Sequence, residues 1–81
     1  MSESDQIKVR LFGGLDAQTS LGAAHGSVPA TGLATVADLL RAVGLPEGTV
    51  GLILVNGFHV KFVGQLVPGD EVSLFPFVGG G

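Results

Sequence analysis

One segment of this 81-residue sequence has the apolar spacing of an amphipathic helix, and it is short. Val36, Leu39, Leu40 and Val43 stand at positions i, i+3, i+4 and i+7, so they share one face of a helix. A single apolar stripe must be buried against a second layer, and the other apolar segments of the chain have strand patterns. The expected architecture is therefore one helix packed across a sheet.

Both ends of this helix carry capping signals. Thr35 is a typical N-cap residue, and Asp38, three positions later, is a shorter version of the acid that completes a capping box. At the other end, Gly44 followed by Pro46 is a conventional helix stop. The helix is expected to begin after Thr35 and to end before Gly44.

The first strand is expected at residues 7–11, where apolar and basic side chains alternate. A pair of glycines ends it. Residues 13–32 are rich in Gly, Ala, Ser and Thr, and they predict no more than a short second strand at 27–30. Pro29 lacks a backbone N–H, so it would restrict that strand to an edge of the sheet.

The second half of the chain has the pattern of a hairpin followed by a last strand. Residues 52–55 form an apolar run typical of a buried strand, and Asn56 with Gly57 is a strong signal for a tight hairpin turn. After this turn the chain would return through residues 58–60. A Pro-Gly-Asp turn at 68–70 then precedes a strand that runs almost to the C-terminal glycines.

This order of elements predicts an α+β fold of the β-grasp (ubiquitin-like) type. It would have a mixed sheet of four to five strands, one main helix across it and a flexible C-terminal Gly-Gly tail. At this length the chain is expected to form a single domain spanning residues 1–81. A final strand placed centrally, beside the first, would anchor the base of the tail in the core.

Composition argues against several classes of function. The four basic residues are scattered and are outnumbered by seven acidic ones, so no nucleic-acid footprint is present and a partner with a basic docking face is expected. Residues 1–5 are polar and acidic, unlike a secretory signal, and are expected to be flexible. The longest aliphatic run spans only residues 52–55. We therefore expect a cytoplasmic protein that does not bind membranes.

The sequence also offers no metal site and no catalytic machinery. It has no cysteine, and His25 and His59, which a helix and a strand separate in the expected order, are interpreted as surface residues. Asp70 and Glu71 could act as an acid–base pair, but adjacent strand residues face opposite sides, and turn chemistry is the favoured interpretation. We expect no bound cofactor, no metal and no enzyme activity in the chain itself.

The C-terminal residues Gly79, Gly80 and Gly81 have no side chains to pack, so a flexible tail is expected at 79–81. A frayed end or an expression scar would look the same. A slender tail could instead enter a narrow channel and present its terminal carboxylate there. Residues 78–81 can extend at most ~14 Å, at ~3.3–3.6 Å per residue, which is enough to thread into a neighbouring active site.

The residues that precede the tail separate these interpretations. They are Asn56-Gly57 after an apolar strand, Leu66 before the run Pro68-Gly69-Asp70-Glu71-Val72, then Leu74-Phe75-Pro76 and a terminal glycine pair. This series resembles the MoaD/ThiS family of ubiquitin-like sulfur carriers. The similarity covers the whole chain and is most specific in residues 56–81.

The resemblance implies a carrier that is the substrate of other enzymes. An E1-like enzyme would use its own ATP to adenylate the carboxylate of Gly81, and a sulfur donor would displace AMP to leave a thiocarboxylate. The sulfur acceptor would be an enzyme such as the large subunit of molybdopterin synthase. Chain length and Leu74-Phe75-Pro76 favour the molybdopterin branch of the family, whereas Val78-Gly79-Gly80-Gly81 resembles some thiamine-type carriers.

Two other classes of function remain open at this point. A ubiquitin-like modifier would pass the same activated carboxyl of Gly81 to a lysine amine and form an isopeptide bond. A β-grasp binding module would carry the tail without using it. Removal of Gly81 separates this last class from the two that depend on the tail.

Phe75, Pro76, Phe77 and Val78 lead into the tail and are candidates for partner binding. The two phenylalanines should project from the face opposite the apolar face of the last strand. There they would form an exposed patch that docks the activating enzyme or the acceptor, because exposed aromatics are favoured interface anchors. The alternative interpretation is that both aromatics close the core at the end of the sheet.

Overall fold

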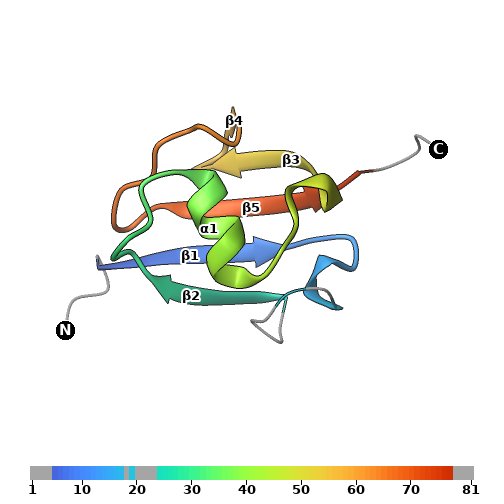
Figure 1. Cartoon of the computed structure of the whole chain (residues 1–81), viewed down its shortest axis with the longest axis horizontal. Coiled ribbons are helices and arrows are strands. Elements are labelled where there is room, and N and C mark those ends of the chain that lie inside the picture. Colours follow the sequence, from blue (N-terminus) through green and yellow to red (C-terminus); the bar gives the residue numbers. More distant parts are fainter. Residues whose placement is uncertain (1–4, 18, 20–23, 78–81) are drawn as a thin grey trace.

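The computed structural model describes residues 5–17, 19 and 24–77 (Figure 1). In this part of the chain five strands form one mixed sheet in the order β2-β1-β5-β3-β4, and one α-helix crosses a face of that sheet. The elements in chain order are β1 (Gln6–Leu11), the 3-10 helix η2 (Leu15–Ala17), β2 (His25–Pro29), α1 (Val36–Val43), the 3-10 helix η3 (Glu47–Thr49), β3 (Val50–Val55), β4 (Phe58–Val60) and β5 (Glu71–Pro76). The sheet with one helix across it matches the architecture that the sequence predicts.

The core lies between α1 and the face of the sheet that the helix covers. All four apolar helix residues are buried, and they pack against alternate residues of β1, β3 and β5. The buried cluster consists of Ile7, Val9, Leu11, Leu15, Val36, Leu39, Leu40, Val43, Leu45, Val50, Ile53, Val55, Leu66, Val72 and Leu74. No helix among the described residues covers the other face of the sheet, and we call this face the open face.

The last strand, β5, occupies the centre of the sheet. It runs parallel to β1, with Leu11 opposite Leu74, and antiparallel to β3, with Ile53 opposite Leu74. The expectation that the final strand lies centrally beside the first is confirmed. With neighbours on both sides, β5 has backbone partners at each edge and gives the C-terminal segment a fixed starting point.

The Gly- and Ala-rich stretch after β1 contributes more structure than its composition suggests. Leu15, in the short helix η2, is fully buried in the core. β2 runs antiparallel to β1 at the edge of the sheet, as Pro29 predicts, but it begins at His25, two residues before the expected start. None of the residues of β2 is fully buried. Its sequence therefore lacks the alternation of apolar and polar residues from which the start of the strand could have been predicted.

The capping box predicted for α1 is present. The Thr35 side chain accepts a hydrogen bond from the backbone N–H of Asp38 at 3.3 Å. In return the Asp38 carboxylate accepts from the backbone N–H groups of Ala34, at 3.0 Å, and Thr35, at 3.1 Å. These two backbone hydrogen bonds, of which the one from Ala34 has the larger effect, hold the pKa of Asp38 below its ordinary value. The guanidinium of Arg41, 2.6 Å from the Asp38 carboxylate, lowers this pKa further. At the other end Gly44 has the left-handed conformation of a helix stop, with φ 77°.

These contacts make the stability of the fold depend on pH. Because the pKa of Asp38 is lower in the folded chain, its contribution should be complete above about pH 5 and should be lost as the pH falls through the folded pKa. The difference in unfolding midpoint between wild type and Asp38→Asn should therefore be constant near neutral pH and shrink below about pH 4. Thermal unfolding measured across this range, with Glu47→Gln as a control for loss of one exposed carboxylate, checks the prediction. A difference that stays the same down to about pH 3 would contradict it.

Candidate functional site

The C-terminal end of β5 is the centre of the candidate site. The strand ends at Pro76, and Phe77, the last residue that the structure describes, is 69% exposed. The predicted tail residues Gly79, Gly80 and Gly81, and the partner-binding candidate Val78, lie outside the described residues. What the structure describes is therefore the base from which the tail continues.

Two glycines, one just after β1 and one in β3, pack against this base. Gly13, just after β1, has φ +64°, and a Cβ on it would lie 2.5 Å from Cγ of Pro76. Gly51, in β3, is also tightly packed, because a Cβ there would lie 3.0 Å from Cα of Phe77 and 3.1 Å from the carbonyl oxygen of Pro76. A side chain at position 13 would press on the Pro76 ring, and one at position 51 would press on the backbone of residues 76 and 77.

The aromatic residues of the site lie on the open face. The ring of Phe75 stacks on that of Phe12 with centroids 4.5 Å apart and planes 6° from parallel. Leu52 lies opposite Phe75 across the pairing of β3 with β5. Phe12 is 39% exposed and Leu52 is 37% exposed, so this group, which we call the apolar patch, remains open to a partner. Its defining residues are Phe12, Leu52 and Phe75.

This arrangement discriminates between the two interpretations of the C-terminal aromatics. Phe75 does not close the core beneath the helix; it is half-buried through its stacking on Phe12. Phe77 is largely exposed, and Pro76 packs against Gly13. The exposed-patch interpretation describes their positions better, and their role in partner binding stays a prediction.

Sequence reasoning missed Phe12 and Leu52 as members of this patch. A signal for Phe12 was present, because it continues the period-two alternation of Lys8 and Arg10, whose side chains face away from the core. Leu52 was hidden because it stands in an apolar run that reads as buried on both faces, whereas its pairing with Phe75 places it on the open face.

The two residues considered for acid–base work belong to a structural network instead. The Asp70 carboxylate accepts hydrogen bonds from the Asn56 side-chain amide and the Val67 backbone N–H, both at 2.9 Å. The Asn56 side-chain oxygen accepts from the backbone N–H of Glu71 at 3.0 Å. These bonds join the hairpin turn to the turn before β5, so the turn interpretation is confirmed. They fix where β5 begins, and Gly13 and Gly51 lie close to its other end.

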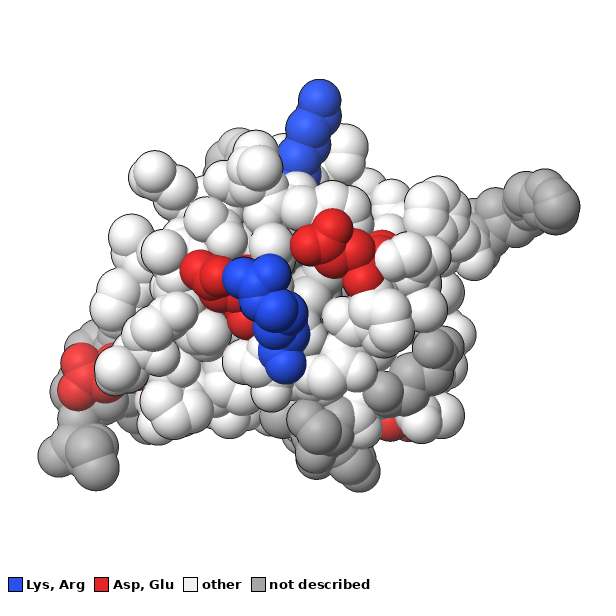
Figure 2. All heavy atoms as spheres, in the orientation of Figure 1, with Lys and Arg blue, Asp and Glu red and all other residues white. Residues whose placement is uncertain are grey.

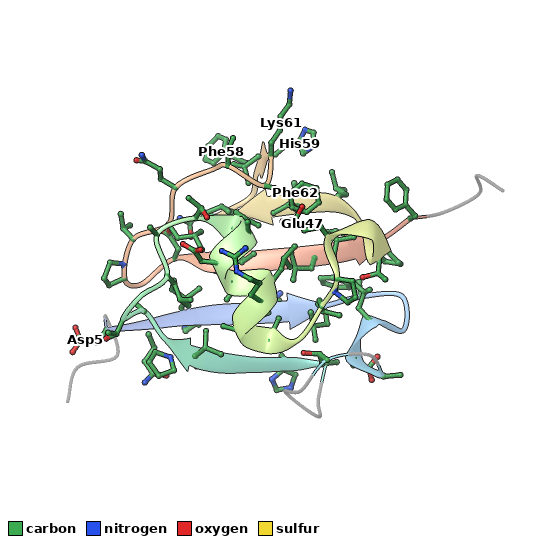
Figure 3. The ribbon with its side chains drawn as sticks, viewed as in Figure 1. Asp5, Glu47, Phe58, His59, Lys61 and Phe62 are labelled. Carbon is green, nitrogen blue, oxygen red and sulfur yellow. The ribbon has the colours of Figure 1, made fainter. Side chains whose placement is uncertain are left out.

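The two histidines are exposed and lie far apart in the fold. His25 is on β2 and His59 on β4, the opposite edge strands of the sheet. His59 lies beside Phe58 and Lys61 near β4, well away from the end of β5 (Figure 3). Within residues 5–17, 19 and 24–77, no three His, Asp or Glu side chains are grouped so as to hold a metal ion.

None of the described helices has the length and apolar character needed to span a bilayer. The charged side chains on the helix-covered face are mixed in sign. Figure 2 shows Lys and Arg there in two separate groups, the central one flanked by Asp and Glu. That face therefore has no basic surface of the kind that binds nucleic acid.

The sequence profile of the family described as Mut7-C ubiquitin matches residues 4–79, nearly the whole chain. The chain belongs to the Mut7-C ubiquitin family. A comparison with curated protein sequences found no match.

Solved structures confirm the β-grasp fold of this family member. A putative molybdopterin converting factor subunit 1 from Pyrococcus furiosus is 25% identical, with 90% of this chain and 98% of that one covered and a TM-score of 0.70. SAMP1 from Haloferax volcanii is 28% identical, with 94% and 99% covered and a TM-score of 0.64. Urm1 from Trypanosoma brucei, at 17% identity, covers both chains fully with a TM-score of 0.71 and supports the fold alone.

These neighbours are small ubiquitin-like proteins and not catalytic enzymes, as expected for this Mut7-C ubiquitin chain. The resemblance inferred from residues 56–81 is thereby confirmed at the level of ubiquitin-like carriers and modifiers. The geometry adds a specific feature: a central strand whose end is held by glycines on both sides, beside an apolar patch.

Proposed function

We propose that this Mut7-C ubiquitin protein is a sulfur carrier whose reactive residue is the C-terminal glycine, Gly81. The observation that carries the proposal is the placement of β5 between β1 and β3, with its end packed against Gly13 and Gly51. A strand held in this way gives the following residues a fixed origin. An enzyme that docks on the apolar patch could therefore receive the tail at a defined position.

The proposed reaction takes place on a partner enzyme. Near neutral pH the carboxyl of Gly81 is ionised, because an α-carboxyl has a pKa of about 3.3–3.7, and a carboxylate is a poor electrophile. In an E1-like enzyme its oxygen attacks the α-phosphorus of ATP and pyrophosphate leaves. A sulfide donor then attacks the acyl carbon and AMP leaves, so that Gly81 carries a thiocarboxylate. This chain supplies the carboxyl, and the partner supplies the ATP site.

The molybdopterin pathway is the destination that we favour for the sulfur. Support comes from Leu74-Phe75-Pro76 in the sequence and from the structural neighbour titled a molybdopterin converting factor subunit. The acceptor would be an enzyme such as the large subunit of molybdopterin synthase, working in the cytoplasm. A thiamine-type pathway is the alternative within the same class of carriers.

A second candidate function is protein modification. Two neighbours of 25% and 28% identity are titled a small archaeal modifier protein and SAMP1. In this function the ε-amine of a lysine on a target protein attacks the activated carbonyl of Gly81. The carbon–nitrogen bond of an isopeptide forms as the leaving group departs.

The intact mass of the protein isolated from its host tests both functions. The mass gain of an oxygen-to-sulfur exchange, mapped to Gly81, is the expected result for a carrier. Peptides of other proteins in which a lysine is joined to Gly81 would support the modifier function. The same measurement reads whether Gly81 is the terminal residue in the cell, which both functions require. The proposal would be overturned by a chain that continues past Gly81. It would also be overturned if Gly81 were never found as a thiocarboxylate or joined to a lysine of another protein.

A further inference from the structure

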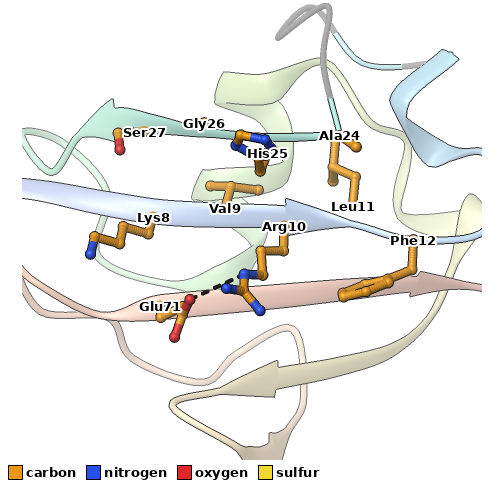
Figure 4. A pocket seen from close by; sticks show the side chains of 10 residues that line it. All are labelled: Lys8, Val9, Arg10, Leu11, Phe12, Ala24, His25, Gly26, Ser27 and Glu71. Atoms are coloured by element: carbon orange, nitrogen blue, oxygen red, sulfur yellow. Dashed lines mark ion pairs between the residues drawn. The ribbon is translucent and has the colours of Figure 1, made fainter.

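A groove of about 660 Å³ runs along the open face, on the side of the sheet away from the helix (Figure 4). Its walls come from three neighbouring strands, β2, β1 and β5. The side chains of Lys8, Arg10 and Phe12 project into it from β1 and the residues after it, and His25 and Ser27 border it from β2. Glu71 lines the groove from β5, and none of the groove side chains takes part in the hydrogen bonds of the Asp70 carboxylate.

The groove is the basic part of an acidic molecule. Lys8 and Arg10 are two of the four Lys and Arg residues in the chain. Arg10 pairs with Glu71 across the strands at 3.2 Å, and Lys8 makes no ion pair with any residue that the structure describes. With two cations and one anion the groove carries a charge of +1, so the remainder of a chain whose formal charge is −3 carries −4. The local sign is opposite to the net sign.

The groove also has an apolar end. Phe12 lines it and stacks on Phe75, a member of the apolar patch near the end of β5. Along β1 the lining changes from the amine of Lys8 through the guanidinium of Arg10 to the ring of Phe12 (Figure 4). A complementary segment would therefore carry acidic side chains at one end and an apolar side chain at the end nearest the tail.

We propose that this groove binds an acidic segment of the E1-like enzyme that activates the tail, with the partner's Asp or Glu side chains against Lys8 and Arg10 and an apolar residue against Phe12. The identity of the partner rests on the proposed function; the acidic chemistry of the segment rests on the groove. Net charge alone predicted a basic docking face on the partner. The separation of charge within this chain instead indicates an acidic docking face on the partner where it meets the groove. Complementary potentials guide two partners into the correct relative position.

A nucleic acid fits the groove less well than a protein segment does. Affinity for nucleic acid grows with the number of phosphates neutralised, and the groove offers only two Lys or Arg side chains, one of them already paired. The charge of −4 on the rest of the molecule would repel a long polyanion. A short acidic segment meets only the local field, since charges beyond about 8–10 Å are screened at moderate salt.

The chain provides a matched pair of charge-reversal variants. Lys8→Glu with Arg10→Glu reverses both cations of the groove, and Arg41→Glu with Lys61→Glu reverses the other two cations of the chain. Each double variant loses one ion-paired arginine, because Arg41 pairs with Asp38 at 2.6 Å. Each also loses one lysine without an ion pair among the described residues. Net charge changes equally in both, so only the place of the change differs.

The first measurement is the KM of the carrier in adenylation by the host's recombinant E1-like enzyme. We expect the groove variant to raise KM by about tenfold or more and the control variant to change it by less than about threefold. Added NaCl should reduce the difference in KM between the groove variant and wild type. Equal effects of the two variants, with wild type adenylated normally, would overturn the inference and leave the proposed function standing. Thermal unfolding of both variants verifies that they are folded.

A second measurement does not depend on any enzyme. An acetylated and amidated peptide of alternating glutamate and leucine is titrated into the labelled protein and amide chemical shifts are recorded. We expect shifts at positions 8, 10 and 27 of wild type and of the control variant. The groove variant should show no shift at Ser27, and the same peptide with lysine in place of glutamate should cause none. The inference would be overturned by shifts only at other residues, by no shifts at all, or by equally strong shifts from oligothymidylate. These outcomes can be read even if the adenylation assay fails for other reasons.

Discussion

Deletion of Gly81 is expected to slow adenylation of the chain by about 100-fold or more, because a misplaced reacting group loses that much rate even when binding is intact. The new terminal carboxyl, that of Gly80, would be set back by up to about 3.3–3.6 Å from the position that the partner's ATP site requires. The fold should not change, since β5 ends at Pro76. ATP–pyrophosphate exchange with the host's E1-like enzyme measures the rate, and thermal unfolding measures the fold.

Deletion of Ser2 is the matched control for this experiment. It also removes one residue near a chain end, at the other terminus, and should leave both the exchange rate and the unfolding midpoint as in wild type. If the chain without Gly81 were adenylated as fast as wild type, and the E1-like enzyme did not require the carboxyl at that position, Gly81 would not be the specific reactive residue. A chain for which neither form is adenylated would instead be described better as a β-grasp binding module with an incidental tail.

Local sequence signals predicted much of the fold correctly because their physical causes are local. The capping box of Thr35 and Asp38 and the left-handed stop at Gly44 depend on residues within one helical turn, and both are present. The hairpin at Asn56 forms as predicted, with β3 paired antiparallel to β4. In each case the atoms that interact are close in sequence.

The features that were missed depend on pairing between distant segments. Phe12 stacks on Phe75 only because β1 lies parallel to β5, and the early start of β2 depends on its ladder with β1. Leu15 reads as an isolated apolar residue in a Gly-rich stretch, yet it is buried in the core. The groove is a product of the same pairings, because it brings Lys8 and Arg10 beside Glu71, more than 60 positions away in sequence.

Gly13→Ala should destabilise the fold by about 2–5 kcal/mol, a large part of the stability of so small a domain. Two causes add together. An alanine at φ +64° adopts the left-handed region at a cost of about 1–2 kcal/mol. Its Cβ would also lie 2.5 Å from Cγ and 2.8 Å from Cδ of Pro76, and overpacking of this kind typically costs about 1–3 kcal/mol. Urea unfolding of the two proteins measures the difference.

Gly14→Ala separates these two causes. Gly14 is the next residue, its φ is +89°, and a Cβ there would meet nothing within 4 Å. Alanine at position 14 has the same backbone strain as alanine at position 13 and lowers the entropy of the unfolded chain to the same extent, but it makes no clash. Gly14→Ala should therefore lower the free energy of unfolding by only about 1–2 kcal/mol. In a Pro76→Ala background the clashing Cγ and Cδ atoms are absent, so the cost of Gly13→Ala should fall to that of Gly14→Ala. Equal costs at positions 13 and 14 in the wild-type background would mean that Pro76 yields freely. Gly13 would then not constrain the end of β5, and the fixed origin of the tail would rest on the backbone pairing of β5 with β1 and β3 alone.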